Sequence, residues 1–212
     1  MGIKIGVLAD PHAMPQPLAE ALALFACEGV TLTLCAGDIA GYGEALDETI
    51  ALLQGAGCHS VIGNHDAWSL ASDTGEMSAA ARAYLQALPP SLSLRVEGAG
   101  VYLVHAHPPQ ENRGGIRLLD QEGGLIDEQC AAWAAELQGL GHEVLVVGHT
   151  HQVFAEQLGD TLVINPGSTA FNHSCAILTL PQRRVEFFAL GGHKIRRIWN
   201  WGLERAAMDG GA

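Results

Sequence analysis

The sequence predicts an α/β fold in which two mixed β-sheets pack face to face and helices cover their outer surfaces. Three observations predict it. Strand-like and helix-like segments alternate through the first half of the chain, the second half is mostly strand-like, and no shift in composition marks a domain boundary. The 212 residues have a mean hydropathy of +0.16, enough to bury a substantial core. We therefore expect residues 1–212 to form a single domain.

A β-α-β-α-β pattern opens the chain. Strands are expected over residues 3–8 and 31–35 and in a short segment ending at 61–62. The helices between them carry apolar stripes formed by Leu18, Leu22 and Phe25 and by Leu46, Ile50 and Leu53. We expect the first helix to end at Gly29 and the second to span residues 44–53.

The later segments supply the second sheet. A helix over residues 78–88 is stopped by Pro89-Pro90, and a hairpin follows over 92–96 and 101–104. Another helix is expected over 128–137 with Asp127 as its N-cap, before strands at 144–147, 153–158, 161–164, 175–180 and 184–190. The glycine-rich residues 114–124 predict a long mobile loop.

The charge balance disfavours long nucleic acids as partners. Eleven Lys and Arg against 23 Asp and Glu leave a formal net charge of −12, which repels a free polyanion. The C-terminal tail is basic, and Ile195, Ile198, Trp199 and Trp201 are interspersed among its charges. Two alternatives stay open for this tail: it packs on its own domain, which is the default, or it contacts a second copy in a homo-oligomer.

Cysteine usage and hydropathy predict a soluble cytoplasmic protein. The five cysteines are widely spaced and form no C-x-x-C pair, so neither a disulfide framework nor a structural zinc cluster is indicated. The chain opens on strand-like residues, and no apolar run approaches the ~18 residues of a membrane span. We expect no secretory leader and no membrane partner.

Six histidines and several Asp or Asn residues follow the expected strands in short runs. The runs are Asp10-Pro11-His12, Gly37-Asp38, Gly63-Asn64-His65-Asp66, His105-Ala106-His107 and Gly148-His149-Thr150-His151. Loops at the carboxyl ends of parallel strands gather at one sheet edge, so these side chains are expected to converge. Residues i and i+2 of extended chain point the same way, which would pair Asp10 with His12 and His149 with His151. Imidazole and carboxylate ligands without thiolate suit Mn, Fe, Zn or Ni.

In this order, the runs resemble the calcineurin-like metallophosphoesterase superfamily. Gly41-Tyr42-Gly43 and Asn165-Pro166-Gly167-Ser168 are similar to segments of its small prokaryotic phosphodiesterase branch. The resemblance implies a four-layer α/β/β/α sandwich, the metallo-dependent phosphatase fold. It implies two divalent metal ions, with Mn first and Ni, Fe, Zn and Co as alternatives. Its implied ligands are Asp10, His12 and His151 for one ion, Asn64, His105 and His149 for the other, and Asp38 as a bridge.

The same resemblance implies a reaction. A hydroxide bridging the metals would attack a small organophosphate, most often a phosphodiester, while His65 donates a proton to the leaving group and Asp66 orients its ring. Arg113, Arg117 and His107 are candidates for contacts to the substrate. For each arginine, the alternative is a solvated loop charge.

Two other functions remain open at this point. One is hydrolysis of nucleotides or dinucleoside polyphosphates, because bound metals neutralise phosphate locally despite the acidic surface. The other is a non-catalytic metal-binding scaffold of the same fold. A trafficking subunit of this superfamily lacks the catalytic histidine, so the presence of His65 favours the enzyme.

Overall fold

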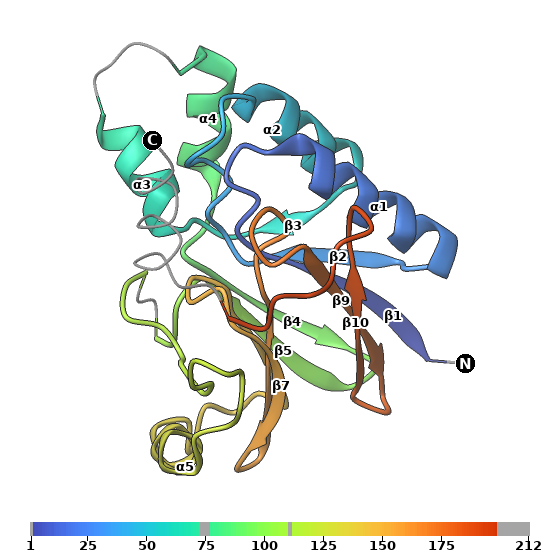
Figure 1. Ribbon diagram of the computed structural model, residues 1–212, viewed down its shortest axis with the longest axis vertical. Helices are drawn as coiled ribbons and strands as arrows, with labels where there is room; N and C mark the ends of the chain where they lie inside the picture. The colour runs from blue at the N-terminus through green and yellow to red at the C-terminus, as the bar shows by residue number, and fades with distance from the viewer. Residues whose placement is uncertain (1, 73–76, 110–111, 199–212) are drawn as a thin grey trace.

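A computed structural model describes residues 2–72, 77–109 and 112–198, and it contains two five-stranded sheets (Figure 1). The first sheet has the order β10-β9-β1-β2-β3, formed by Arg184–Ala189, Ser174–Leu180, Ile3–Leu8, Leu32–Cys35 and His59–Ser60. The second has the order β4-β5-β6-β8-β7, formed by Ser91–Val96, Ala99–Val104, Val144–Val146, Thr161–Pro166 and Val153–Leu158.

Both sheets are mixed, with parallel pairs that create the ligand-bearing edge. Strand β1 runs parallel to β2, and β2 to β3, whereas β9 pairs antiparallel with β1 and β10. In the second sheet β5, β6 and β8 are mutually parallel, and β4 and β7 pair antiparallel at the two edges. The parallel strands β1, β2, β5 and β6 therefore deliver the chain segments that follow them to one end of the molecule.

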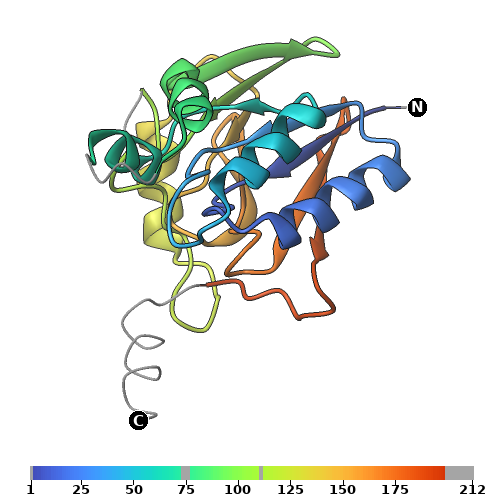
Figure 2. The same cartoon turned by 90° about the horizontal axis from the view of Figure 1, so that it is seen from above.

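Five described helices complete the layers: α1 (Pro15–Glu28), α2 (Leu46–Gly55), α3 (Asn64–Ala71), α4 (Ala79–Ala87) and α5 (Asp127–Glu136). Helices α1, α2 and α4 pack on the outer face of the first sheet through Leu18, Phe25, Leu53 and Leu85 (Figure 2). Helix α5 covers the second sheet, where Trp133 packs beside the buried Phe154. The layers are helix, sheet, sheet and helix, and the predicted fold class is confirmed.

The main core lies between the sheets. It is built from alternate strand residues of both, including Ile5 and Leu178 in the first sheet and Leu103, Val146 and Ile164 in the second, all almost fully buried. Alternation directs every second side chain to one face of a strand, so the remaining apolar residues of β1, β2, β6 and β9 face the helices. The strands are buried on both faces, which explains their nearly continuous apolar sequence.

The helices agree with the sequence predictions only in part. The left-handed φ of 71° at Gly29 ends α1 as expected. Asp127 is the first residue of α5, whose N-cap is Ile126, so the predicted cap was one residue off. Helix α3 was not predicted, because its first residues were interpreted as a loop run.

The glycine-rich segment 114–124 is anchored, which corrects the expectation of a mobile loop. Ile116, Leu118 and Leu119 are buried. The side chain of Gln152 accepts hydrogen bonds from the backbone N–H groups of Leu118 and Leu119 at 2.8 and 3.0 Å, and donates to the Leu119 carbonyl. These contacts hold the segment on the outer face of the second sheet.

The described part of the C-terminal tail packs on its own chain. The Val153 N–H donates to the Arg197 carbonyl, and the Arg197 guanidinium donates to the Gly123 carbonyl, both at 2.8 Å. Ile198 packs against the second sheet's outer cluster. Trp199 and Trp201 lie outside the described residues. No described helix is both long and apolar enough to span a bilayer.

The inter-sheet core predicts a stability test. Leu103 lies between the two sheets, and the surrounding packed strands cannot move in to fill the cavity that Leu103→Ala would leave. We therefore expect this substitution to lower the free energy of unfolding by about 2–5 kcal/mol. Leu125→Ala is the matched control, because that leucine is 44% exposed and its removal leaves no buried void. Urea denaturation of both variants measures the difference, and equal stabilities would contradict this description of the core.

Candidate metal centre

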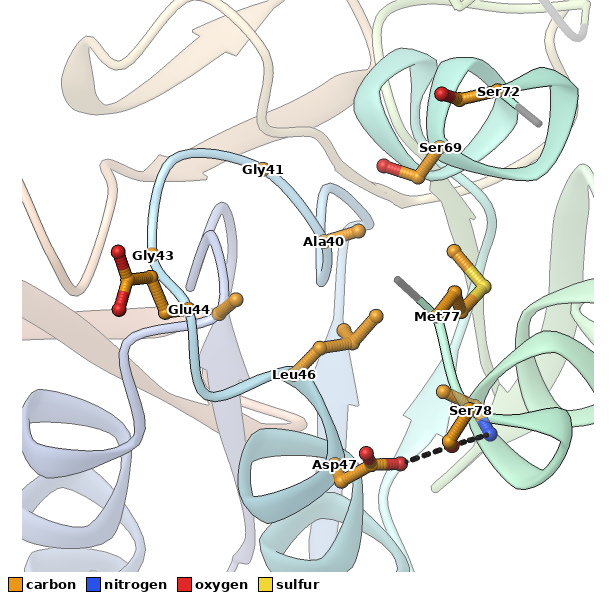
Figure 3. Close-up of a pocket in the computed structure, with 12 residues that line it drawn as sticks. Ala40, Gly41, Gly43, Glu44, Leu46, Asp47, Ser69, Ser72, Met77 and Ser78 are labelled. Atoms are coloured by element: carbon orange, nitrogen blue, oxygen red, sulfur yellow. Dashed lines mark hydrogen bonds between the residues drawn. The ribbon is translucent and has the colours of Figure 1, made fainter. Parts of the chain in front are cut away.

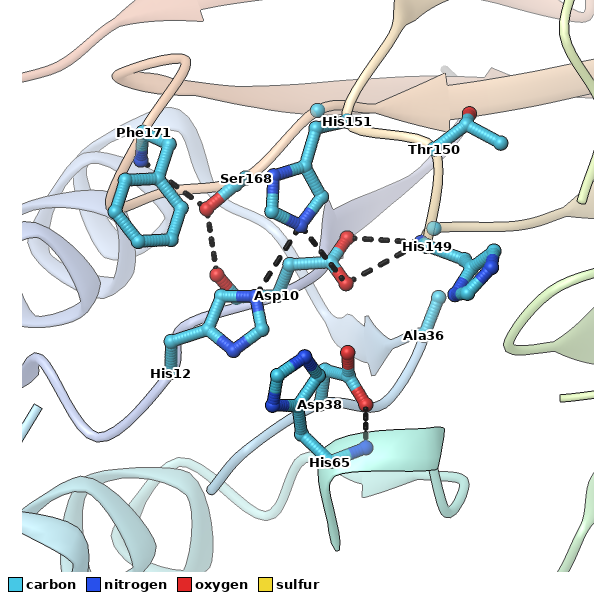
Figure 4. A network of polar contacts seen from close by, with 12 residues as sticks. Asp10, His12, Ala36, Asp38, His65, His149, Thr150, His151, Ser168 and Phe171 are labelled. Atoms are coloured by element: carbon cyan, nitrogen blue, oxygen red, sulfur yellow. Dashed lines mark hydrogen bonds and ion pairs between the residues drawn. The ribbon is translucent and has the colours of Figure 1, made fainter. Parts of the chain in front are cut away.

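All seven expected ligands lie together at the carboxyl end of the parallel strands. Asp10 and His12 follow β1, Asp38 follows β2, His105 follows β5, and His149 and His151 follow β6, while Asn64 begins α3. Figure 4 shows His12 and His151 pointing toward the carboxylate of Asp10, with Asp38 beside them and the His149 ring turned to the other side. Except for the half-buried His149, the seven side chains are buried.

The first cluster joins Asp10, His12 and His151. Nε2 of His12 lies 3.2 Å from Nε2 of His151, which lies 3.5 Å from a carboxylate oxygen of Asp10. The Nδ1–H of His12 donates to the Ala40 carbonyl at 3.2 Å, which leaves the Nε2 lone pair facing the other two side chains.

The second cluster joins Asn64, His105, His149 and Asp38. Oδ1 of Asn64 lies 2.9 Å from Nε2 of His105 and 2.8 Å from Nδ1 of His149. The carboxylate of Asp38 lies 3.4 Å from Nε2 of His105. The Nδ1–H of His105 donates to the Ala36 carbonyl at 2.6 Å, so here too a backbone carbonyl aims Nε2 into the cluster.

Left-handed backbone, not extended chain, brings the ligands together. Asp10, His12, Asp38, His149 and His151 have φ between 49° and 64°. The prediction that i and i+2 residues of an extended chain would pair is therefore wrong about the backbone. It is also wrong about His149, which joins Asn64 and His105 instead of His151. Such φ values cost of order 1–3 kcal/mol each in non-glycine residues and are concentrated at functional sites.

Burial and the surrounding charges set the protonation of these groups. Burial raises the pKa of the Asp38 carboxyl, but attraction to His105 outweighs it and the net shift is downward. Burial lowers the pKa of His105, and the same attraction to Asp38 reverses that shift. Burial also lowers the pKa values of His12 and His149 to about 4, so both rings are neutral at pH 7.

The residues present fit metal ions. Two buried carboxylates, Asp10 and Asp38, have only histidines as ion-pair partners among the described residues, and a buried charge of this kind is normally paired or bound to a metal. Nitrogens bound to one ion at 2.0–2.1 Å lie about 3 Å apart, close to the 3.2 Å between His12 and His151. Three overlapping groups, linked through His12 and Asp38, could each hold an ion: Asp10, His12, His151; His12, Asp38, His65; and Asp38, His105, His149.

His65 lies beside the ligands, but Asp66 does not contact its ring among the described bonds. The carboxylate of Asp66 accepts hydrogen bonds from the backbone N–H groups of Ala40 and Gly63, at 2.7 and 2.9 Å. This differs from the orienting role implied by the resemblance. Asp66 caps the start of α3 instead, and burial followed by repulsion from Asp38 raises its pKa to about 7. Nε2 of His65 lies 3.0 Å from the hydroxyl of Tyr42.

The candidates for substrate contacts lie around the glycine-rich segment. Arg113 and Arg117 are exposed, and the segment between them is tied to the metal centre because Thr150 donates to the Ile116 carbonyl at 3.0 Å. His107 is half-buried, with its ring 5.4 Å from that of Trp133. None of the three belongs to the described groups that could hold a metal.

Three buried polar residues support the ligands and were not assigned a role from sequence. Asn165 donates to the carbonyl of Gly148, directly before His149, and Asn172 donates to the carbonyl of His151. The Ser168 hydroxyl donates to the carbonyl of Asp10 at 2.6 Å. The sequence signal for Asn165 and Ser168 was the Asn165–Ser168 motif, which does not show the backbone groups they reach, and Asn172 lies outside that motif.

A pocket of about 530 Å³ lies next to the centre (Figure 3). It is lined by residues of the segment 40–47, by Ser69 of α3, by Met77 and Ser78 just before α4, and by Ala81 of α4. None of the seven expected ligands lines it. The pocket therefore lies behind the segment 40–44 and is separate from the metal centre.

Fold and site together define a metal-dependent hydrolase of phosphate esters. Residues 3–182 match the family model of the calcineurin-like phosphoesterase superfamily domain, and the chain belongs to that superfamily. This membership confirms the resemblance and the assignment as a metal-dependent phosphoesterase.

Similar proteins come from archaea. The Methanocaldococcus jannaschii protein MJ0912 is 28% identical over 179 residues, which cover 77% of this chain and 68% of that protein. The crystal structure of the Pyrococcus horikoshii protein PH1004 aligns with a TM-score of 0.74 at 18% identity, covering 98% of this chain and 94% of that one. A structurally and functionally characterised archaeal phosphodiesterase aligns with a TM-score of 0.59 at 18% identity, covering 89% of this chain and 100% of that one.

The position of Asp38 predicts its effect on metal binding. Asp38 belongs to two of the three ligand groups, so Asp38→Ala should remove more bound metal than the loss of any histidine that serves one group. The exposed Asp160→Ala is the control for loss of one carboxylate. Equilibrium dialysis with elemental analysis measures the bound ions per chain, and unchanged binding in Asp38→Ala would disprove this arrangement.

Proposed function

We propose that this protein is a dinuclear phosphodiesterase acting on a small organophosphate. The convergence of the two ligand clusters on either side of Asp38 carries the proposal. Asp10, His12 and His151 would hold one ion, and Asn64, His105 and His149 the other, with Asp38 shared. Manganese is the ion we expect first. The archaeal phosphodiesterase has the same fold, which supports testing a diester first.

Two ions held here would supply Lewis-acid stabilisation of the phosphate oxygens and would acidify bound water. The chain itself supplies the ligand geometry and the acid. His65 projects beside Asp38, to which its backbone N–H donates at 2.8 Å. From this position His65 would give a proton to the leaving oxygen as its bond to phosphorus breaks and the electron pair stays on oxygen.

The compartment is part of the proposal. All five cysteines are free, and Cys35 and Cys175 are buried among apolar side chains. This usage is typical of a reducing compartment, so we place the protein in the cytoplasm.

Activity assays test the proposed reaction. Metal-stripped protein is titrated in turn with Mn, Ni, Co, Zn and Mg and assayed with matched p-nitrophenyl mono- and diesters. We expect metal-dependent cleavage, faster for the diester. On diphenyl phosphate, whose phenolate leaving group is basic and needs a proton, His65→Ala should lower turnover by about 10²–10⁴-fold, while bound metal stays near the wild-type amount.

His59→Ala is the control for this variant, because His59 is an exposed histidine of β3. Equal turnover of diphenyl phosphate by His65→Ala and wild type would exclude the acid role. Protein that is fully loaded with metal and cleaves neither ester would favour the alternative function, a non-catalytic metal-binding scaffold.

A nucleotide substrate is a second candidate, favoured by two exposed aromatic side chains. Trp68 is 51% and Tyr42 is 47% exposed, and their rings lie 4.8 and 4.7 Å from that of His65. Large apolar side chains exposed together beside a catalytic group mark a binding surface. Their faces suit a planar group such as a nucleobase.

Competitive inhibition distinguishes a nucleotide site from a general phosphate site. Adenosine 5′-monophosphate and ribose 5-phosphate differ only in the base, so wild type should bind the nucleotide more tightly. Trp68→Ala should remove that difference, a loss of about 1–3 kcal/mol or roughly 5- to 150-fold in inhibition constant. Leu125→Ala should keep it. Equal inhibition of wild type by both compounds would reject the nucleotide candidate.

A further inference from the structure

A proton donor must be held in one orientation, and in this chain Tyr42 contacts the donor ring. The Tyr42 hydroxyl and Nε2 of His65 are 3.0 Å apart and share a hydrogen bond. The neighbouring carboxylate of Asp66 is committed to the backbone of Ala40 and Gly63. Among the described side-chain hydrogen bonds, the one to Tyr42 is the bond that orients the His65 imidazole.

Packing fixes the position of Tyr42 although its side chain is half exposed. Its ring packs edge-on against His12, with centroids 4.8 Å apart, and against Phe171, at 5.5 Å. Both of these rings lie next to His151, so the tyrosine rests on His12 of the first ligand cluster and on Phe171, which stacks on His151.

The backbone on both sides of Tyr42 is also fixed. The Gly43 N–H donates to the carbonyl of His12 at 2.8 Å, and the Ala40 N–H donates to Asp66. A Cβ on Gly41 would overlap the His12 ring, and one on Gly43 would overlap the Ala13 carbonyl. Gly41 also has a φ of 150°, which side-chain-bearing residues rarely adopt. These two glycines allow the segment to press against the residues after β1, which directs the tyrosine hydroxyl at His65.

A hydroxyl is suited to this task because it both donates and accepts. Because Nε2 bonds to Tyr42, the proton for the leaving oxygen would come from Nδ1; the hydroxyl accepts from Nε2–H before and after that transfer, and it can donate to Nε2 in the other neutral tautomer. An ionised carboxylate only accepts, and would lose its bond when Nε2 carries no hydrogen.

We propose that Tyr42 is the positioning residue of His65 in the hydrolysis of a phosphate ester, and that the Gly41-Tyr42-Gly43 segment exists to place its hydroxyl. The inference rests on the proposed function for the reaction in which His65 donates a proton. The contact between Tyr42 and His65 can be tested without turnover.

The kinetic test uses two diesters that differ in their need for a proton. Diphenyl phosphate releases a basic phenolate, and bis(p-nitrophenyl) phosphate releases a much less basic one. Tyr42→Phe keeps the ring packing but removes the hydroxyl, so kcat should fall about 10- to 100-fold for the diphenyl ester and far less for the nitrophenyl ester. In a His65→Ala background, Tyr42→Phe should cause no further loss on either ester.

Tyr102→Phe is the matched control, because its hydroxyl donates to one acceptor, the Pro109 carbonyl, at 2.7 Å. It should leave the rates on both esters and their ratio unchanged. An equal loss on both esters, or the same loss from Tyr42→Phe with and without His65, would overturn the proposal and assign Tyr42 a structural role.

A spectroscopic measurement separates this inference from the proposed function. The ring ¹⁵N signals of His65 are assigned in metal-free protein by comparison with His65→Ala. Tyr42→Phe should shift them, and Tyr102→Phe should not. If wild type cleaves neither ester, the proposed function fails and these signals alone decide: a shift supports the contact, and unchanged signals overturn it.

Discussion

Two buried carboxylates set the requirements for the rest of the site. Asp10 and Asp38 are almost completely removed from solvent, where an uncompensated charge would be very costly. The chain compensates with oriented donors: the backbone N–H of His149 bonds to Asp10, and that of His65 bonds to Asp38. Each carboxylate also has a histidine within 3.5 Å. Bound cations would complete this compensation, so metal binding and the local fold depend on the same side chains.

This requirement explains where the strained backbone lies and what holds it. Five of the seven ligands have left-handed φ, and buried polar side chains bond to the carbonyl groups beside them. Asn165, Ser168 and Asn172 serve this purpose from β8 and the turn after it. A strained loop persists only where its surroundings over-determine it. The inter-sheet core therefore contributes to catalysis indirectly, because it fixes β1, β6 and β8 relative to one another.

The sequence predicted the strands and the convergence of the candidate ligand side chains because both depend on local signals. Apolar runs mark buried strands, and ligand types at successive strand ends mark the shared edge. The features that the sequence analysis did not predict depend on contacts between residues far apart in the chain. Helix α3 was missed because its opening residues were interpreted as a loop, although Asp66, three residues after Gly63, was an available capping signal. Residues 114–124 were expected to be mobile because their anchor, Gln152, lies 33 residues or more away.

The candidate substrate surface is aromatic, so under the proposed function the positive charge that binds phosphate would come from the metal ions. The described groups in contact with His65 include Tyr42, Trp68, His12 and the Asp38 carboxylate. Arg113 and Arg117 are exposed on their own segment. An acidic chain with buried carboxylates repels phosphate until cations reverse the local charge. Phosphate recognition should therefore follow metal loading, whereas the aromatic rings can discriminate between organic groups without it. Under the proposed function, substrate specificity and charge neutralisation would therefore belong to different parts of one site, and specificity could change without disturbing the metal ligands.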